Sequence, residues 1–465
     1  MKYSKEFEML GLTSVLRIAL IILFTTALAS CGGGGGSSKG SSGSATPPPP
    51  PPPPPPLPTA DPATGFTFDF RLRFLPDPPN VSPRIYASVA TGDFNGDGRS
   101  DLAASLQGRH ELEVFLQKPD GTLAEPLVYP LSTNNYMPRN MLILNDFNND
   151  GADDVVFEIK DNSGNGKISI LLSRLGQQPL TPRELSTTKV YVESGSGPNG
   201  YAALDFNDDG NADIVEFHSW KTSSATLANC VPNLSCPHLV VYAGNGRGDV
   251  GAPYFLPWIG SPDRDARDFF VQDIDMDGRD DVVFSSFVGN LQQYRLYAMK
   301  RNSDGSLSDP APVVETNVGD APAFFGDLNS DGRTDLIYGA TVHFRESSGR
   351  FGTAVRLGLR YNMESYWNVL GDFDGNGQTD IVNHQFEGFQ TVPYFVTYLQ
   401  KGGKVQSPFF RYDPPTNNFV SPDKRGRQAF AVGDFNGDGC RDIAVAAQYS
   451  GLLFLEGRNC IRAVR

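Results

Sequence analysis

Short apolar runs rich in Val, Ile, Phe and Leu recur along residues 66–465. Examples are LAASL, VVFEI, IVEF and LIYG, each of which directly follows a polar string rich in aspartate, asparagine and glycine. Runs of this length and composition predict β-strands, and no amphipathic helical pattern flanks them. The hydrophobic pattern therefore predicts an all-β fold for this part of the chain.

The polar string is itself a repeat. It first reads DFNGDGRSDL, and its seven copies begin at Asp93, Asp146, Asp205, Asp273, Asp327, Asp372 and Asp434, spaced 45 to 68 residues apart. Every copy has aspartate at positions 1 and 9, Asp or Asn at positions 3 and 5, and glycine at position 6. Ordinary surface turns use the same residue types, but they do not explain seven matching copies. Positions 2 and 10 are apolar throughout, so we expect their side chains to point into a core.

Alternating side-chain oxygens are typical of loops that surround a calcium ion, because calcium takes roughly six to eight oxygen ligands. Side chains at positions 1, 3, 5 and 9 with a backbone carbonyl at position 7 supply such a set, and glycine at position 6 permits the sharp turn. The string thus matches the first nine positions of an EF-hand loop. However, predicted strands flank it where an EF-hand has helices, and only the third copy has a glutamate, Glu216, at position 12. We therefore expect a loop between two strands.

On these residues the repeats resemble the calcium loops of FG-GAP, or VCBS, repeats, found in integrin α-subunit propellers, some fungal lectins and many bacterial surface proteins. The resemblance covers residues 66–465 and implies a seven-bladed β-propeller with a calcium-binding hairpin loop in each blade, hence up to seven Ca²⁺ ions. The implied ligands are Asp93, Asn95, Asp97 and Asp101; Asp146, Asn148, Asp150 and Asp154; Asp205, Asn207, Asp209 and Asp213; Asp273, Asp275, Asp277 and Asp281; Asp327, Asn329, Asp331 and Asp335; Asp372, Asp374, Asn376 and Asp380; Asp434, Asn436, Asp438 and Asp442.

A fainter repeat of glycine turns, such as KPDG and NSDG, lies between the polar strings. A strand, a polar loop, two further strands, a glycine turn and a fourth strand make one blade of a propeller. The last repeat ends after its third strand, GLLFLEGR. We therefore expect the N-terminal segment 65–75 to supply the missing outer strand and to close the ring.

Residues 1–30 are typical of a secretory leader, because basic residues precede an apolar stretch, 18–29, that is too short for the roughly 20 residues of a membrane span. The leader ends LASC, which resembles the lipobox of bacterial lipoproteins and implies a lipid anchor on Cys31. Ordinary cleavage near Ala29 is the alternative. Glycine at position 32 implies an outer-membrane lipoprotein of the cell envelope, facing the periplasm or the surface. Residues 31–65, rich in Gly, Ser and Pro, are expected to form a disordered tether.

Four cysteines remain besides Cys31, and an even number in an exported protein suggests disulfides. Cys230 and Cys236 are close enough in sequence to close one loop, and Cys440 with Cys460 would fix the C-terminus to the last polar string. A zinc site is the weaker alternative, because none of the five histidines has metal-ligand spacing to these cysteines.

The formal net charge is −14 with a pI near 4.9. Seven divalent cations would offset this charge, so the acidity is explained by the predicted metal loops. A surface of this sign argues against nucleic acid as a partner. We expect a monomer that binds a glycan or an envelope or extracellular protein, with the membrane contacted through the lipid.

Long aromatic segments, residues 217–238 and 383–393, and the link 255–270 are predicted to lie on the face opposite the polar loops. The residues expected to line a ligand groove there are His218, Trp220, Trp258, Arg264 and Arg267. An exposed tryptophan beside polar groups suits stacking on a sugar or holding a peptide. Alternatively, either tryptophan fills a gap between blades. An RGD string at 247–249 falls in a glycine turn that needs these residue types anyway.

Two function classes remain open, because a propeller hosts unrelated activities. The first is a calcium-stabilised, non-catalytic adhesion or binding module. The second is a polysaccharide-active enzyme, a lyase or glycosidase, that uses paired carboxylates. The sequence contains no HExxH or Walker string, and its GxSxG spacing, at 36–40, falls in the Gly/Ser-rich tether. The only candidate catalytic side chains are His218, His384, Glu216 and Glu387, so we favour the binding module.

Overall fold

The computed structural model describes residues 60–61, 63–73, 84–107, 109, 111–130, 142–160, 166–179, 182–185, 200–218, 238–257, 266–288, 293–318, 323–339, 341–356, 367–386, 393–405, 410–413, 429–447 and 451–461. Contacts divide the chain into two compact units, Met1–Pro55 and Pro56–Arg465, and every described residue belongs to the second. The predicted leader, Cys31 and the tether up to residue 59 lie outside the described residues. No helix in the described part is long and apolar enough to cross a membrane.

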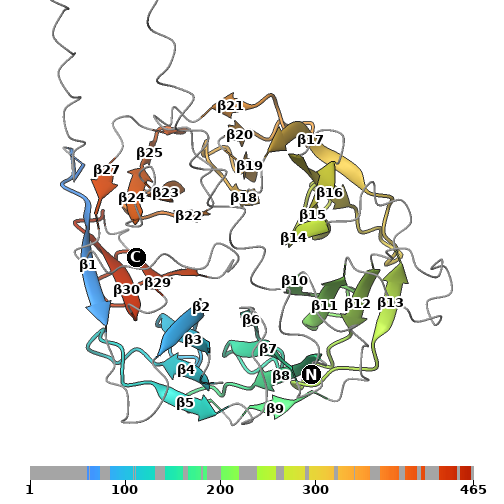
Figure 1. Cartoon of the computed structure of the whole chain (residues 1–465), viewed down its shortest axis with the longest axis horizontal. Helices are drawn as coiled ribbons and strands as arrows, with labels where there is room; N and C mark the ends of the chain where they lie inside the picture. Colours follow the sequence, from blue (N-terminus) through green and yellow to red (C-terminus); the bar gives the residue numbers. More distant parts are fainter. Residues whose placement is uncertain are drawn as a thin grey trace, which may run out of the picture. The chain divides into compact units, whose positions relative to one another are not determined.

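Seven four-stranded antiparallel sheets make up the second unit and are arranged as the blades of a ring (Figure 1). This architecture confirms the predicted seven-bladed β-propeller. The strands of blades 1 to 3 are β2 (Ile85–Gly92), β3 (Asp101–Gln107), β4 (Glu111–Phe115) and β5 (Leu127–Pro130); β6 (Leu142–Asn145), β7 (Asp154–Lys160), β8 (Gly166–Leu171) and β9 (Arg183–Glu184); β10 (Gly200–Leu204), β11 (Asp213–His218), β12 (His238–Tyr242) and β13 (Tyr254–Pro257).

The remaining blades repeat this order, and a two-stranded hairpin is added to blade 6. Their strands are β14 (Ala266–Gln272), β15 (Asp281–Val288), β16 (Gln293–Met299) and β17 (Ala311–Val318); β18 (Ala323–Gly326), β19 (Asp335–Tyr338), β20 (Thr341–His343) and β21 (Val355–Arg356); β22 (Trp367–Gly371), β23 (Asp380–Phe386), β24 (Pro393–Tyr398) and β27 (Phe410–Tyr412), with the hairpin β25 (Gln400–Lys401) and β26 (Lys404–Val405); and β28 (Phe430–Gly433), β29 (Asp442–Ala446), β30 (Leu452–Arg458) and β1 (Thr67–Arg73).

Apolar side chains fill the spaces between adjacent blades. In one such cluster, between blades 3 and 4, Phe217 stacks on Phe269 and Phe284 with ring centroids 5.2 and 6.0 Å apart. The apolar residues at positions 2 and 10 of every polar string are buried, as the sequence predicts. Burial of each such side chain stabilises the fold by about 1.5–3 kcal/mol. The polar loops are therefore fixed to the blade interfaces by the residues that flank their charges.

β1 completes blade 7, the sheet that the C-terminal residues begin. It pairs antiparallel with β30, from Thr67 opposite Arg458 to Arg73 opposite Leu452. Arg73 also donates to two backbone carbonyl oxygens of blade 1, at 3.2 and 2.8 Å. On the other side, Asp61 accepts a 2.7 Å hydrogen bond from Lys401 of blade 6. The N-terminal segment thus contacts three consecutive blades, and its described part begins before the predicted tether boundary at residue 65.

A disulfide joins Cys440 to Cys460, with their Cα atoms 5.7 Å apart. This is the predicted link between the last polar string and the C-terminal segment. Beyond it, the Ile461 N–H donates to the backbone oxygen of Asp374 in blade 6 at 2.6 Å. The C-terminal segment therefore also crosses from one blade to its neighbour. Cys230 and Cys236 lie outside the described residues.

Candidate functional site

The seven polar strings form loops between the first and second strands of each blade. We call them loops 1 to 7, which comprise residues 93–101, 146–154, 205–213, 273–281, 327–335, 372–380 and 434–442. Position 9 is the first residue of the second strand in every blade. Because equivalent strand ends lie at the same face of a propeller, all seven loops lie on one face, beside the turns between third and fourth strands.

The carboxylate at position 1 holds each loop in its turn. In loop 1, Asp93 Oδ1 accepts from the Asp97 N–H at 2.9 Å, and Oδ2 accepts from the Gly98 N–H at 2.6 Å. The same two bonds recur in loops 2, 3, 4, 5 and 7. In loop 6 the bond to the position 6 glycine is present. Positions 1, 3 and 5 are thereby held on the inner side of a tight turn.

The aspartate at position 9 is fully buried in all seven loops. One of its oxygens accepts from the N–H of position 2, and the other accepts from an N–H just after or at the end of the third strand, at 2.7 to 2.9 Å throughout. We call the second donor the anchor residue; the seven anchor residues are Gln117, Ser173, Gly244, Arg301, Arg345, Gln400 and Gly457. Position 9 therefore fastens each loop to its own third strand, a role that the sequence did not reveal.

Burial raises the pKa of these carboxyl groups, and the other carboxylates of each loop raise it further, whereas the backbone hydrogen bonds lower it. The pKa is raised to about 7 for Asp101, Asp154 and Asp380 and to about 8 for Asp442. It is raised by the same causes in loops 3, 4 and 5. Negative charge is therefore costly in these loops when nothing positive accompanies it, which favours a bound cation.

The oxygen atoms of the loops converge as a hard cation requires. In loops 4 and 6, which have aspartate at position 3, one carboxylate oxygen from each of positions 1, 3 and 9 lies within 4.8 Å of the others. In the described part, Asp372 Oδ1 and Asn148 Oδ1 are buried oxygen atoms without a hydrogen-bond partner. An oxygen in that state is stabilised by a cation that accepts its lone pair. The residues present therefore fit calcium.

The backbone conformation at position 4 is a further constraint, and it was not predicted from the sequence. Its backbone φ is positive in all seven loops, from 56° at Asn149 to 73° at Gly375. Glycine occupies the position in three loops, whereas Asn149, Asp208, Met276 and Ser330 adopt this conformation in the others. Left-handed backbone is uncommon outside glycine and strained for long side chains. The alternation of Gly, Asn and Asp at this position was the signal that could have revealed it.

Arginine accompanies the position 5 aspartate in several loops. Arg99, Arg279 and Arg333 stand at position 7 of loops 1, 4 and 5, and each pairs with the carboxylate two residues before it. Each also donates from Nε to the backbone oxygen of its own anchor residue, at 2.9 to 3.3 Å. In loop 7, Arg458 pairs with Asp438 at 2.9 Å. The seven loops therefore share a backbone shape but differ in local charge.

Most residues of the proposed ligand groove lie outside the described residues, namely Trp220, Trp258 and Arg264. His218 ends β11, where its backbone pairs with His238, and Arg267 lies in β14 opposite Ser285. The groove formed by these five residues therefore stays a prediction.

Two of the candidate catalytic side chains are buried within blades. His384 packs against the rings of Phe395 and Phe430, with centroids 5.2 and 5.7 Å away, and burial lowers its pKa to about 3. Glu216 accepts a 3.2 Å hydrogen bond from the Tyr242 hydroxyl. Both side chains are therefore engaged inside their blades, His384 by packing against aromatic rings and Glu216 by a hydrogen bond. Glu387 lies outside the described residues.

The RGD string lies in a turn packed on loop 2. The Gly248 N–H donates to the backbone oxygen of Phe147 at 2.8 Å, and the carboxylate of Asp249 lies 3.7 Å from Arg183. A contact between blades therefore accounts for the glycine and aspartate of this string.

Family models described as FG-GAP-like repeat match residues 93–157 and 273–338, and one described as FG-GAP repeat matches residues 427–459. Similar solved structures include a rhamnogalacturonan lyase from Bacillus licheniformis (13% identity, TM-score 0.42), over 87% of this chain and 74% of that one. The V. cholerae biofilm matrix protein Bap1 (14%, TM-score 0.31) aligns over 75% of this chain and 43% of its own. A puromycin hydrolase (14%, TM-score 0.46) aligns over 78% and 50%. The search of curated proteins found no match.

Proposed function

Because the chain is a seven-bladed β-propeller that contains FG-GAP repeats, we propose that it is a calcium-stabilised, non-catalytic binding module of the bacterial cell envelope. The observation that carries this proposal is the sevenfold loop, in which converging oxygens and buried carboxylates recur with the same hydrogen bonds. Loops of this kind hold ions and fix the scaffold, and they leave the opposite face to contact a ligand.

The residues that would hold calcium are those at positions 1, 3, 5 and 9 of each loop, with the carbonyl of position 7. Calcium would supply positive charge to carboxylates that are packed together and that are fully buried at position 9. The hydrogen bonds of positions 1 and 9 leave further lone pairs on the same oxygens for a cation. Calcium would therefore stabilise the loops without changing their backbone.

The ligand in this proposal is a glycan or a protein that docks on the face opposite the loops. The test is a binding screen of the purified, calcium-loaded chain on a glycan array, with Trp220→Ala and Trp258→Ala as variants. Arg247→Ala, on the face that carries the loops, is the matched control. Binding that is lost in a tryptophan variant and kept in the control supports a lectin-like module. If no glycan on the array binds, the glycan ligand is excluded and a protein ligand remains.

Catalysis on polymeric sugars is the competing function, and incubation of the chain with such polymers decides between the two. A binding module releases neither new reducing ends nor unsaturated products. Either product, formed in proportion to the amount of the chain, would overturn the non-catalytic proposal.

Lipid attachment at Cys31 is the proposed means by which the module stays at the outer membrane. Cys31→Ser should abolish incorporation of a labelled fatty acid and release the protein from the membrane fraction. Retention of the label in the variant would contradict lipidation at this residue.

A further inference from the structure

Every loop forms a hydrogen bond with the blade that follows it around the ring; loop 5 donates this bond and the other six loops accept it. These contacts join Gln117 Nε2 to the oxygen of Asp434 (2.5 Å), the Gly176 N–H to the oxygen of Asn95 (2.5 Å), the Gly248 N–H to that of Phe147 (2.8 Å), Arg301 Nη1 to that of Phe206 (2.8 Å), Arg345 Nη1 to that of Asp273 (2.9 Å), Ser330 Oγ to Gln400 Oε1 (3.0 Å), and the Ile461 N–H to the oxygen of Asp374 (2.6 Å). Each loop is thus built within one blade and braced by the next.

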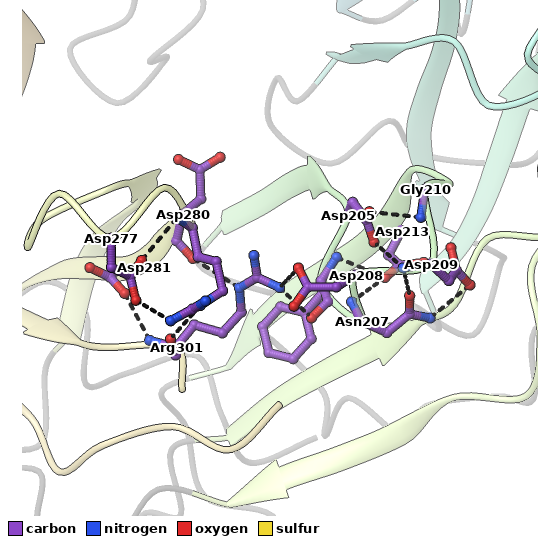
Figure 2. Close-up of polar contacts among 12 residues, drawn as sticks. Asp205, Asn207, Asp208, Asp209, Gly210, Asp213, Asp277, Asp280, Asp281 and Arg301 are labelled. Atoms are coloured by element: carbon purple, nitrogen blue, oxygen red, sulfur yellow. Dashed lines mark hydrogen bonds and ion pairs between the residues drawn. The ribbon is translucent and has the colours of Figure 1, made fainter. Parts of the chain in front are cut away.

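Arginines brace two of the loops, Arg301 on loop 3 and Arg345 on loop 4, and Arg301 additionally pairs with a carboxylate of the loop that it braces. Arg301 belongs to blade 4, and its side chain is only 5% exposed. Its Nη1 donates both to the backbone oxygen of Phe206 and to Asp208 Oδ1, each at 2.8 Å. Figure 2 shows the guanidinium reaching from the loop 4 side toward the side chains of loop 3. One arginine therefore fixes both the backbone of position 2 and the side chain of position 4.

The same arginine connects the buried aspartates of two neighbouring loops. Its N–H donates to Asp281 Oδ1, at position 9 of loop 4, at 2.8 Å. The residue that it braces, Phe206, donates its own N–H to Asp213 Oδ2, at position 9 of loop 3, at 2.9 Å. A continuous path of hydrogen bonds thus runs from one candidate cation site to the next (Figure 2).

Loop 3 has a particular need for this brace. Its position 7 is Asn211, where loops 1, 4 and 5 have an arginine that pairs with position 5. Its position 4 is Asp208, which adds a carboxylate on a left-handed backbone with φ of 58°. Arg301 offsets that charge and holds the backbone from which positions 1 and 3 project.

We propose that Arg301 of blade 4 is a positioning residue for the divalent-cation loop of blade 3, so that this site is shared between two blades. The inference rests on the proposed calcium role of the loops. Arg301 would not contact the ion; it would set the distance between the ligands of positions 1, 3 and 9. Two observations carry this inference. The buried guanidinium of Arg301 donates two hydrogen bonds to loop 3, and these bonds form part of the path that connects the buried aspartates of loops 3 and 4.

The chain itself suggests variants that should fold. Anchor residues are Ser173 in blade 2 and Gln117 in blade 1, and position 4 is Asn149 in loop 2 with a φ of 56°. The double variant Arg301→Ser with Asp208→Asn therefore removes the brace with residues that equivalent positions tolerate. It also removes one positive and one negative charge, so the local net charge is unchanged. Arg301→Gln with Asp208→Asn is the conservative partner, since Gln117 still reaches a carbonyl of the neighbouring loop.

The experiment is hydrogen exchange by mass spectrometry on the full chain, over a series of free calcium concentrations. The probes are the N–H groups of Asp209 and Gly210, which donate to Asp205 at 2.9 and 2.8 Å, within peptides that cover 205–213. Peptides that cover 372–380 report loop 6 as the internal control. In the serine double variant, the calcium midpoint for loop 3 should rise about tenfold, the equivalent of one hydrogen bond to a charged group. The glutamine variant should show a smaller rise, and loop 6 should not change.

An unchanged loop 3 midpoint in the serine double variant would overturn the inference. An equal rise in loops 3 and 6 would also overturn it, because that pattern reports general destabilisation. If calcium protects no loop of the unaltered chain, the calcium proposal fails first and this inference fails with it. The first two outcomes leave the calcium proposal standing, so the two failures are distinguishable.

Discussion

Loops 4 and 6 have aspartates at the same three positions, but their surroundings differ. In loop 4, Asp275 lies 3.1 Å from the Lys300 ammonium and Asp277 pairs with Arg279. In loop 6, position 5 is Asn376, Asp374 is fully buried, and burial raises the pKa of its carboxyl group. The two loops therefore share one spacing of candidate ligands. In loop 4 basic side chains offset the charge of the carboxylates, whereas in loop 6 the charge is buried.

The difference suggests that the loops depend on calcium to different degrees. A carboxylate paired with an arginine keeps its position when the ion is removed, because the pair offsets its charge. A buried carboxylate near two others has a stronger need for a metal ion. We therefore expect loop 6 to lose order before loop 4 as free calcium falls.

The largest expected effect comes from the buried aspartate at position 9. Asp380→Ala leaves three buried N–H groups without their acceptor, and Asp281→Ala in loop 4 leaves two. Each should cost about 2–5 kcal/mol of stability in chelator, because each unsatisfied buried group costs about 1–3 kcal/mol. Urea unfolding of each variant in chelator measures this loss of stability. With calcium present, the loop 6 variant should lose more than the loop 4 variant, and equal losses would remove the distinction between the two loops.

The next effect concerns the disulfide, whose C-terminal neighbour Ile461 donates to loop 6. Replacement of Cys440 and Cys460 by serine should destabilise the fold by about 2–4 kcal/mol. Hydrogen exchange should rise in residues 372–380 and stay unchanged in residues 273–281. A rise in both loops alike would show that the C-terminal segment has no specific role at loop 6.

The pH dependence of the metal-free protein follows from the raised pKa values. Folded Asp101, Asp154 and Asp380 bind protons up to a pKa of about 7 and Asp442 up to about 8, whereas the unfolded residues lose them near 3.8. The folded state therefore binds more protons between the unfolded pKa of 3.8 and the folded values of about 7 and 8, and stability falls as pH rises across that range. His384 has the opposite effect on stability: because its pKa is lowered in the folded state, stability rises with pH, but only below pH 6.5. In chelator the melting temperature should fall between pH 6.5 and 8.5. Excess calcium should abolish this fall. A fall that persists in excess calcium would count against ion binding at position 9.

The smallest effect is a backbone one at position 4. Met276 of loop 4 is exposed with φ of 63°, so Met276→Gly should stabilise the protein by about 0.5–1 kcal/mol. The equivalent Gly375 of loop 6 has the Ile461 backbone oxygen 2.0 Å from where a Cβ would lie. Gly375→Ala should therefore destabilise, and thermal unfolding measures both changes. Equal signs for the two variants would contradict this account.

Much of this architecture was predictable from the sequence. Seven aspartate-rich strings predicted the number of blades, and their apolar positions 2 and 10 predicted the core, because both signals keep the same positions within every string. The hydrogen bonds of position 9 were not predictable, since the anchor residue lies at a separation that varies between blades. The contact between Arg301 and Asp208 joins residues 93 positions apart, for which the motif contains no signal.

The most direct test of the calcium loops is thermal unfolding of the full chain in chelator and in excess calcium, with magnesium at the same ionic strength as the control. The sample should first be shown by elemental analysis to contain bound calcium. We expect chelation to lower the melting temperature, calcium to restore it, and magnesium to restore less because it demands a smaller octahedral site. The same melting temperature in all three conditions would contradict the claim that calcium stabilises this propeller.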